Sequence, residues 1–224
     1  MDSQIAILIF TQEVAKDASR KRLTFNQNKG LNQYIFRQLN NRINSLAGLV
    51  GLPVIRSSEL NLGGGSFGKK LTNAIVSAFD KGYSKVICIG NDCPALNQNS
   101  LNDAIASLEK YNSVLGPDTR GGAYLIGVSK ENFDAERFEK LLWQDSRMLN
   151  SFLENIDTEA CILPTLSDIH SYQNLKFYHY RTSFVSFLLR LIEPIISRVA
   201  VESPHHLLSR FFSFKSLRAP PQVS

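Results

Sequence analysis

Hydrophobic and polar positions follow two patterns in turn along this chain, one typical of strands and one of helices. Continuous apolar runs at residues 5–10 and 86–89 predict strands that are covered on both faces. Between and after them, apolar side chains recur three or four positions apart, which predicts helices. These side chains are Leu31, Ile35, Leu39, Ile43 and Leu46, then Phe67, Leu71, Ala74, Ile75 and Ala78, then Leu101, Ile105 and Leu108. This alternation favours an α/β sandwich with a largely parallel sheet.

The sequence patterns that predict the remaining strands and helices are weaker. Residues 49–55 fit a second strand, although Pro53 counts against it. Residues 114–116 and 124–128 predict two strands around a turn, and residues 161–163 predict a late strand. Residues 138–152 are expected to be mostly helical, with Trp143 on an apolar face. We expect one domain over residues 1–180 and an extension over residues 181–224.

The extension carries most of the net charge. It holds 6 basic and 2 acidic residues, whereas the chain as a whole has a net charge of +5. Its apolar stretch, residues 184–199, is interrupted by Arg190, Glu193 and Arg198 and is too short and too charged to span a membrane. It predicts an amphipathic helix that packs on the body or on a second copy, or alternatively lies on a membrane surface. Residues 203–224 are expected to form a flexible tail.

Composition excludes several classes of protein. With 224 residues, 43% hydrophobic and 20% charged, the chain is neither disordered nor fibrous. Three cysteines without a CxxC pair indicate neither a disulfide scaffold nor structural zinc, and the N-terminus lacks signal-peptide features, so we expect a cytoplasmic protein. Basic residues form no cluster on residues 1–180, so no nucleic-acid partner is expected.

A glycine-rich segment, residues 63–70, nearly fits a phosphate-binding P-loop. The glycines and Lys69 are correctly spaced, but Lys70 stands where a Ser or Thr would hold Mg²⁺. Two other interpretations are a loop that merely opens a helix, or a loop whose Gly64 approaches a ligand phosphate at a helix N-terminus.

Three later segments carry candidate chemistry. Asp92 follows the buried strand 86–89, at the edge where α/β sheets bind ligands, and either binds a divalent cation or caps a turn. Gly121 and Gly122 let the backbone approach a ligand, or simply form a tight turn. Asp168 and His170 project to the same side of an extended chain, as metal ligands or as loop residues.

Together, these segments resemble a family of small bacterial glycosyltransferases in the nucleotide-diphospho-sugar transferase (GT-A) superfamily. Some members are associated with arsenosugar biosynthesis, others with radical-SAM or selenium genes. The family pattern is a Gly-rich helix start, IG(S/T)DCP, LGPxxDGGYYLIG, a Trp-containing helix and LPxLxDIDT. This chain matches it in order at residues 63–70, 89–94, 115–127, Trp143 and residues 163–170, over about residues 5–176.

The chain also departs from that pattern. The family's first loop resembles PGxVKTRL, and only the last two residues of segment 17–23 match it well. Arg120 replaces the acid before the paired glycines, His170 replaces the second late acid, and Gln144 replaces a Ser or Thr. Asp92 and Asp168 are retained.

The resemblance implies a GT-A three-layer α/β/α sandwich that uses a nucleotide-sugar donor and an unknown acceptor. It implies Mg²⁺ or Mn²⁺ at Asp92, Asp168 and His170, with the cation against the donor diphosphate. The implied contacts to phosphate or sugar come from Lys21, Arg22, Arg120, Gly121 and Gly122, and Asp118 is the nearest candidate for a general base. Two alternatives stay open: a degenerate member that binds without transfer, because of Arg120 and His170, and a nucleotidyltransferase on the same fold.

Overall fold

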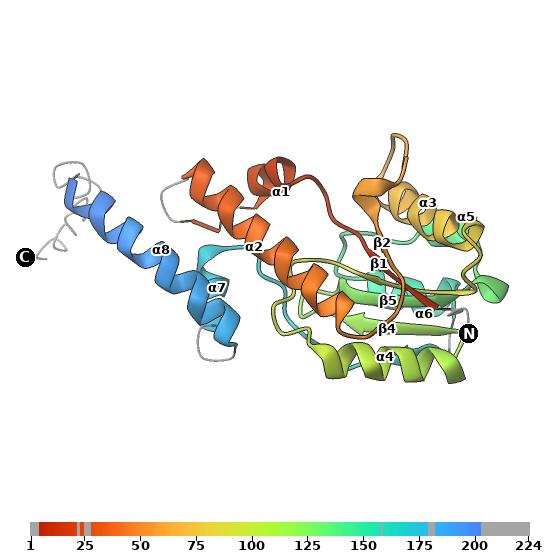
Figure 1. The fold of residues 1–224 in the computed structure, drawn as a ribbon. Helices are drawn as coiled ribbons and strands as arrows, with labels where there is room; N and C mark the ends of the chain where they lie inside the picture. The colour runs from red at the N-terminus through yellow and green to blue at the C-terminus, as the bar shows by residue number, and fades with distance from the viewer. Residues whose placement is uncertain (1–4, 22, 25–27, 158, 179–181, 203–224) are drawn as a thin grey trace, which may run out of the picture.

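The computed structural model describes residues 5–21, 23–24, 28–157, 159–178 and 182–202 (Figure 1). Arg22 and the tail expected at residues 203–224 lie outside these residues. Within the described part of the chain, no helix is both long and apolar enough to cross a bilayer.

A six-stranded sheet with the order β2-β1-β3-β5-β4-β6 forms the centre of the fold. β1 is parallel to β2 and β3, β4 is parallel to β6, and β5 alone runs antiparallel to both of its neighbours. The predicted α/β class with a mostly parallel sheet is confirmed. The bounds are β1 (Ile5–Ile9), β2 (Val54–Arg56), β3 (Lys85–Ile89), β4 (Ser113–Pro117), β5 (Ala123–Ser129) and β6 (Cys161–Ile162). β2 is shorter than the predicted 49–55, since the chain first passes through Pro53, which has no N–H to donate to a neighbouring strand.

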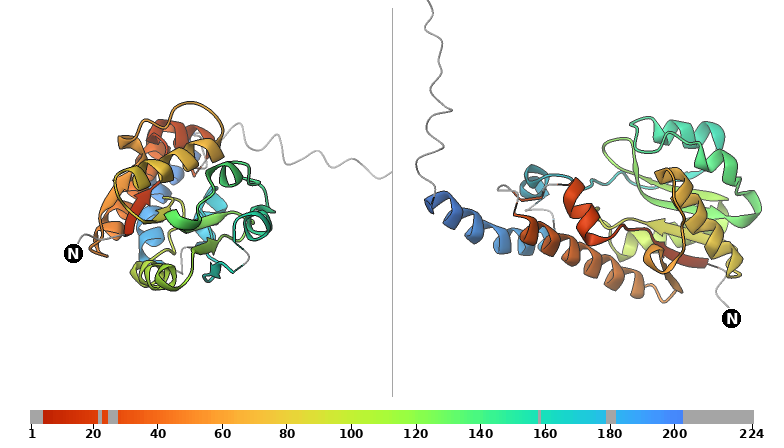
Figure 2. Two further views of the ribbon diagram at one scale, coloured as in Figure 1. Left: turned by 90° about the vertical axis from the view of Figure 1, so that its right-hand side faces the viewer. Right: turned by 90° about the horizontal axis from the view of Figure 1, so that it is seen from above.

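Helices cover both faces of this sheet, which gives three layers (Figures 1 and 2). α2 (Lys29–Gly48) and α4 (Gln98–Lys110) lie on one face, and α3 (Phe67–Asp80), α5 (Ala135–Glu139) and α6 (Met148–Asn155) lie on the other. Alternate residues of β1 point to opposite faces: Ile7 packs with α2 and α4, and Leu8 packs with α3. Two short 3₁₀ helices, Ser57–Glu59 and Lys130–Asn132, complete this body.

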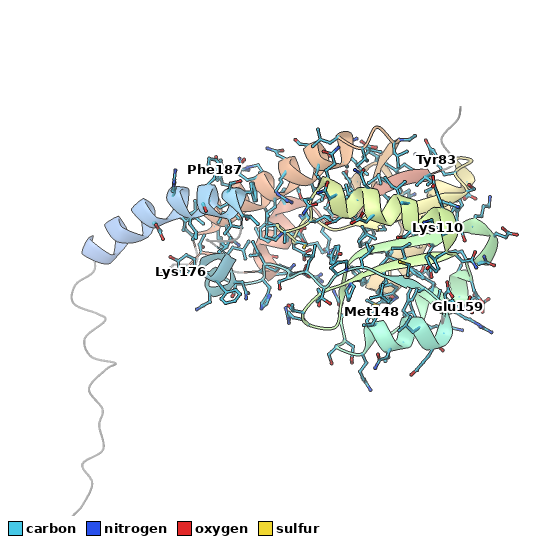
Figure 3. All side chains as sticks on the ribbon, turned by 90° about the horizontal axis from the view of Figure 1, so that it is seen from below. Tyr83, Lys110, Met148, Glu159, Lys176 and Phe187 are labelled. Atoms are coloured by element: carbon cyan, nitrogen blue, oxygen red, sulfur yellow. The ribbon has the colours of Figure 1, made fainter. Side chains whose placement is uncertain are left out.

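A separate hydrophobic core lies beyond the carboxyl ends of β1 and β3. It is formed by the first half of α2, by α1 (Val14–Arg20), by α7 (Tyr172–Tyr178) and by α8 (Ser183–Glu202). Four residues of α8 are buried in it: Val185, Leu188, Leu189 and Ile192. α8 then continues away from the body (Figure 2), and Figure 3 shows Lys176 and Phe187 at this end of the molecule, far from Tyr83 and Glu159.

The segment from 138 to 152 is not mostly helical, as predicted, but consists of two helices with a turn between them. α5 ends at Glu139 and α6 begins at Met148. Gln144 has a φ of 64°, a left-handed conformation that interrupts a right-handed helix. Trp143 therefore lies in the turn, where its indole N–H donates a hydrogen bond of 2.9 Å to the carbonyl oxygen of Phe138.

Candidate active site

A cavity of about 490 Å³ opens at the carboxyl ends of β1 and β3. The chain leaves β1 toward β2 on one side and later returns to form β3 on the other, so this is the point where the strand order reverses. Open α/β sheets bind ligands at such a point, and the volume suits a small organic ligand. Polar residues that line it are Thr11, Gln12, Asp17, Arg20, Lys21, Asn91, Asp92, Asp118, Gln144 and Asp168.

Lys21 and Asp92 form an ion pair that lines this cavity. We call the part of the lining formed by Lys21, Asp92, Asp118 and Asp168 the floor. Asp92 follows β3, as predicted, and its carbonyl oxygen accepts a hydrogen bond of 2.7 Å from the backbone N–H of Ile169. The neighbouring Asn91 is buried, and its amide donates a 2.6 Å hydrogen bond to the side-chain oxygen of Asn40 on α2. The Asp92 loop is therefore attached both to α2 and to the loop that carries Asp168.

Asp118 begins the turn between β4 and β5 and organises it. Its Oδ1 accepts hydrogen bonds from the backbone N–H groups of Arg120, at 2.6 Å, and Gly122, at 2.9 Å. Gly121 has a φ of 87°, and a Cβ there would lie 2.0 Å from the carbonyl oxygen of Ser146. A Cβ on Gly122 would lie 2.5 Å from Oδ2 of Asp118. The paired glycines are thus required by the turn itself, and Gly122 also lines the cavity.

Asp168 approaches the same floor from the segment after β6. Its backbone segment is held by the bond from Ile169 to Asp92 and by a 3.1 Å bond from the Leu166 N–H to the Pro117 carbonyl. The Oδ1 atom of Asp168 is buried and has no hydrogen-bond partner. The structure therefore brings together the predicted residues Lys21, Asp92 and Asp168 with Asp118.

The electrostatics of the floor are dominated by three neighbouring carboxyl groups. Burial, with the nearby charges of Asp92 and Asp118, raises the pKa of Asp168 to about 9 and so keeps it protonated at neutral pH. Burial alone would lower the pKa of Lys21, but chiefly the charge of Asp92 and its hydrogen bond with the ammonium outweigh burial and raise that pKa, so the ammonium stays charged. Burial and the charges of Arg120 and Lys21 lower the pKa of His170, which favours its neutral form.

Another part of the cavity wall is apolar and aromatic. The rings of Phe10 and Phe67 meet edge to face at 5.5 Å, and Phe67 lies 5.7 Å from Trp143. The backbone of Gly68 allows α3 to approach this wall, since a Cβ there would lie 2.4 Å from Trp143 and from the Glu139 carbonyl oxygen. The glycine-rich segment thus contributes a packing contact.

Several predicted residues are not at the floor. Gly64 is exposed and does not line the cavity, and no neighbour lies within 4 Å of a Cβ placed on it. Arg120 is exposed at the edge, near enough to His170 to affect its pKa, but neither residue lines the cavity. Arg22 lies outside the described residues.

Sequence reasoning missed other cavity residues, among them Asp17, Arg20 and Gln12. The position directly after strand 5–10 was a usable signal for Gln12, because loops at carboxyl ends of parallel strands converge.

A divalent cation fits this arrangement poorly. Among the residues that the structure describes, no three His, Cys, Asp or Glu side chains are grouped to hold a metal ion. Asp92 is paired with Lys21, and Oδ1 of Asp118 already accepts two backbone N–H groups. The Oδ1 atom of Asp168 has no partner, but this carboxyl is protonated at neutral pH, so a metal ion would have to displace its proton in order to bind.

Comparisons with known proteins place the fold. The family described as "Uncharacterized protein conserved in bacteria (DUF2064)" matches residues 55–145. No curated protein matches the chain. A "putative nucleotide-diphospho-sugar transferase" from Desulfovibrio desulfuricans G20 superposes with a TM-score of 0.72 at 21% identity, covering 88% of this chain and 98% of that one. The chain therefore has a GT-A-like fold.

Two mycobacterial structures are more distant. Rv0371c from Mycobacterium tuberculosis H37Rv has a TM-score of 0.46 at 10% identity, over 79% of this chain and 97% of that one. Glucosyl-3-phosphoglycerate synthase from Mycobacterium tuberculosis, in complex with Mn²⁺, UDP and glucosyl-3-phosphoglycerate, has a TM-score of 0.38 at 10% identity, over 84% and 80%. Both TM-scores are below 0.5, so neither similarity supports a conclusion about this chain.

Proposed function

We propose that this protein transfers a sugar from a nucleotide-diphospho-sugar donor to an acceptor. The observation that carries the proposal is the Lys21–Asp92 ion pair beside Asp118 and Asp168, at the floor of a 490 Å³ cavity where the strand order reverses. The GT-A-like fold supports the same class of reaction. An aromatic wall together with a charged floor suits a ligand with an apolar ring and a charged diphosphate.

In this proposal the donor diphosphate lies against the basic residues of the first loop. Lys21 and Arg20 line the cavity and present ammonium and guanidinium groups, and Arg22 is the third basic residue of that loop. The sugar occupies the space beside Gly122, where a larger residue would collide with Asp118. Arg120, at the edge, contacts the diphosphate or the acceptor.

The reaction needs a base for the acceptor and a positive charge for the leaving group. The bond between the anomeric carbon and the donor phosphate oxygen breaks as the acceptor oxygen bonds to that carbon. The acceptor proton passes to the carboxylate of Asp118, and the departing nucleoside diphosphate keeps the electron pair of the broken bond. Positive groups already in position stabilise that charge as it develops. We leave metal dependence, predicted with Asp92, Asp168 and His170 as ligands, to experiment.

Thermal unfolding with a panel of nucleotide-sugars and nucleoside diphosphates tests the proposal. A ligand that binds only the folded state increases the free energy of unfolding, by about 2.7 kcal/mol at a ligand concentration of a hundred times its Kd. It therefore raises the midpoint temperature of unfolding. We expect one nucleotide series to raise it for the wild type and for Asp103→Asn, a matched change on the exposed side of α4, but less for Asp92→Asn. No shift with any nucleotide would contradict the proposal.

Products then separate the alternatives. Release of a nucleoside diphosphate from the donor identifies a glycosyltransferase, whereas release of pyrophosphate from a nucleoside triphosphate and a sugar phosphate identifies a nucleotidyltransferase. Nucleotide binding without either product would identify a degenerate member and refute transfer. In that case, the changes Arg120→Asp and His170→Asp together should restore turnover if those two positions caused the loss.

We also propose that residues 181–224 form an extension of a cytoplasmic transferase, and that its helix α8 packs mainly on the body. The four buried residues of α8 support packing on the body, and the three free cysteines suit a reducing compartment. Phe187 is 46% exposed and is available for a membrane surface or a second copy. Liposome pelleting and the oligomeric state of the wild type and Phe187→Ser test that contact.

A further inference from the structure

The ammonium group of Lys21 is the cation that lies among the carboxyl groups of Asp92, Asp118 and Asp168. The Nζ atom of Lys21 forms an ion pair with Oδ2 of Asp92, and Asp17 and Asp168 also lie near enough to influence its pKa. The side chains of Lys21 and Asp92 are only 30% and 24% exposed. Such a pair is screened less by solvent than a surface pair, so the ammonium has a defined place.

The side chain of Asn32 on α2 holds the backbone around Lys21. The buried Asn32 of α2 donates hydrogen bonds to the carbonyl oxygens of Lys21, at 2.7 Å, and Ala18, at 2.6 Å. Its side-chain oxygen accepts a 3.0 Å bond from the N–H of Leu23, which is itself fully buried. The backbone is therefore tied to α2 at Ala18, Lys21 and Leu23, which anchors the base of the lysine side chain.

Lys21 occupies a position that a divalent cation bound to Asp92 would need. Its Nζ atom is paired with Oδ2 of Asp92, and Oδ1 of the neighbouring Asp118 is engaged by two backbone N–H groups. Arg120 adds a second positive side chain at the turn that Asp118 organises. The chain thus supplies positive charge at the floor, from Lys21, and at the edge, from Arg120.

We propose that the Lys21 ammonium takes the role of a divalent cation, so that donor binding in this protein needs no metal. The inference rests on the proposed function. An ammonium has three N–H donors, and one can stay on Asp92 while the others reach oxygens of the diphosphate. It then faces the charge that the leaving nucleoside diphosphate acquires. Asp92 in this role positions the lysine.

Two measurements test the inference, on the full chain of the wild type, Lys21→Met, Lys21→Arg and Lys16→Met. Lys16 is an exposed lysine on α1 and serves as the matched control. The first measurement is Mn²⁺ binding without nucleotide, followed by electron paramagnetic resonance. We expect Mn²⁺ to bind Lys21→Met, whose carboxylates have lost their cation, at least ten times more tightly than the wild type or either other variant.

The second measurement is calorimetric titration with UDP, GDP, ADP and CDP, in EDTA and in Mn²⁺. We expect EDTA to leave the wild-type affinity unchanged, and Lys21→Met to weaken it in EDTA by about ten- to a hundredfold, the worth of a charge-assisted hydrogen bond. Mn²⁺ should restore part of the loss, and Lys21→Arg should retain metal-free binding. Unchanged circular dichroism shows that Lys21→Met is folded.

The outcomes are distinguishable. Tight binding of Mn²⁺ to the wild type, or loss of its nucleotide affinity in EDTA, would overturn the inference and leave the proposed function standing. If no nucleotide binds under any condition, the proposed function fails. The role of Lys21 toward a diphosphate then fails with it.

Discussion

Changing Gly68 to alanine should destabilise the fold and disturb the aromatic wall of the cavity. Gly68 is buried in α3, directly against the turn that carries Trp143. The added Cβ would lie 2.4 Å from a ring carbon of Trp143 and 2.4 Å from the carbonyl oxygen of Glu139. The backbone oxygen cannot rotate away as a side-chain end can, so α3 and the turn must separate.

The magnitude follows from two opposing effects. Overpacking of this kind costs about 3 kcal/mol at the upper end of its range, which we choose because a neighbour is backbone. Alanine in place of glycine in a helix returns about 1 kcal/mol. The net loss of about 2 kcal/mol should lower the melting temperature by about 4–8 °C in a chain of this length.

Tryptophan fluorescence during heating measures both effects at once, because the chain has one tryptophan. Gly64→Ala is the matched control: it lies in the same glycine-rich segment, its φ is ordinary, and no atom would meet its Cβ within 4 Å. We expect Gly64→Ala to stay within about 0.5 kcal/mol of the wild type. The reasoning is refuted if Gly68→Ala melts and emits like the wild type, or if Gly64→Ala is equally destabilised.

Three further changes test the polar side of the site. Asp168→Asn should stabilise the protein at neutral pH. The folded wild type keeps the Asp168 proton to about pH 9, whereas the unfolded chain loses it near pH 4. The stability of the wild type therefore falls as the pH rises across that interval, by at most about 1.4 kcal/mol per pH unit. Urea unfolding at several pH values should show the advantage of Asp168→Asn growing with pH, and a constant difference would contradict the raised pKa. Asn32→Ala leaves buried backbone groups near Lys21 unpaired and should cost about 1–3 kcal/mol in the same assay and speed hydrogen exchange in that loop; unchanged exchange would count against it. Gly121→Ala should lower the melting temperature, because its Cβ would lie 2.0 Å from a carbonyl oxygen at a φ of 87°, and an unshifted transition would show that the turn can relax.

The architecture of the sheet was predictable because it depends on local patterns. The apolar runs at residues 5–10 and 86–89 form most of the central strands β1 and β3, and the carboxyl ends of these strands meet at one edge, so Asp92 was found from its position alone. The Gly121–Gly122 turn was also found, since a turn that needs a positive φ requires glycine.

The pairing within the site was not predictable from local patterns. Lys21 and Asp92 are 71 positions apart, and nothing in either segment indicates the other. The break at Gln144 was missed because apolar spacing continues across it, and the left-handed residue there is not a glycine. That Gly64 lies outside the cavity lining was not predictable, because glycine-rich loops before helices have the same composition whether they bind phosphate or only lead into the helix.

The core formed by α1, α2, α7 and α8 has a consequence for the order in which the protein matures during synthesis. Leu23, two positions after Lys21, and Ile169, next to Asp168, are both buried in that core together with four residues of α8. A ribosome releases the chain from its N-terminus, at about 5–20 residues per second, so the sheet can pair while α8 is still in the exit tunnel. Lys21 and Asp168 then acquire their final places only after α8 has left the tunnel, and a chain that stalls before residue 183 would lack a finished site.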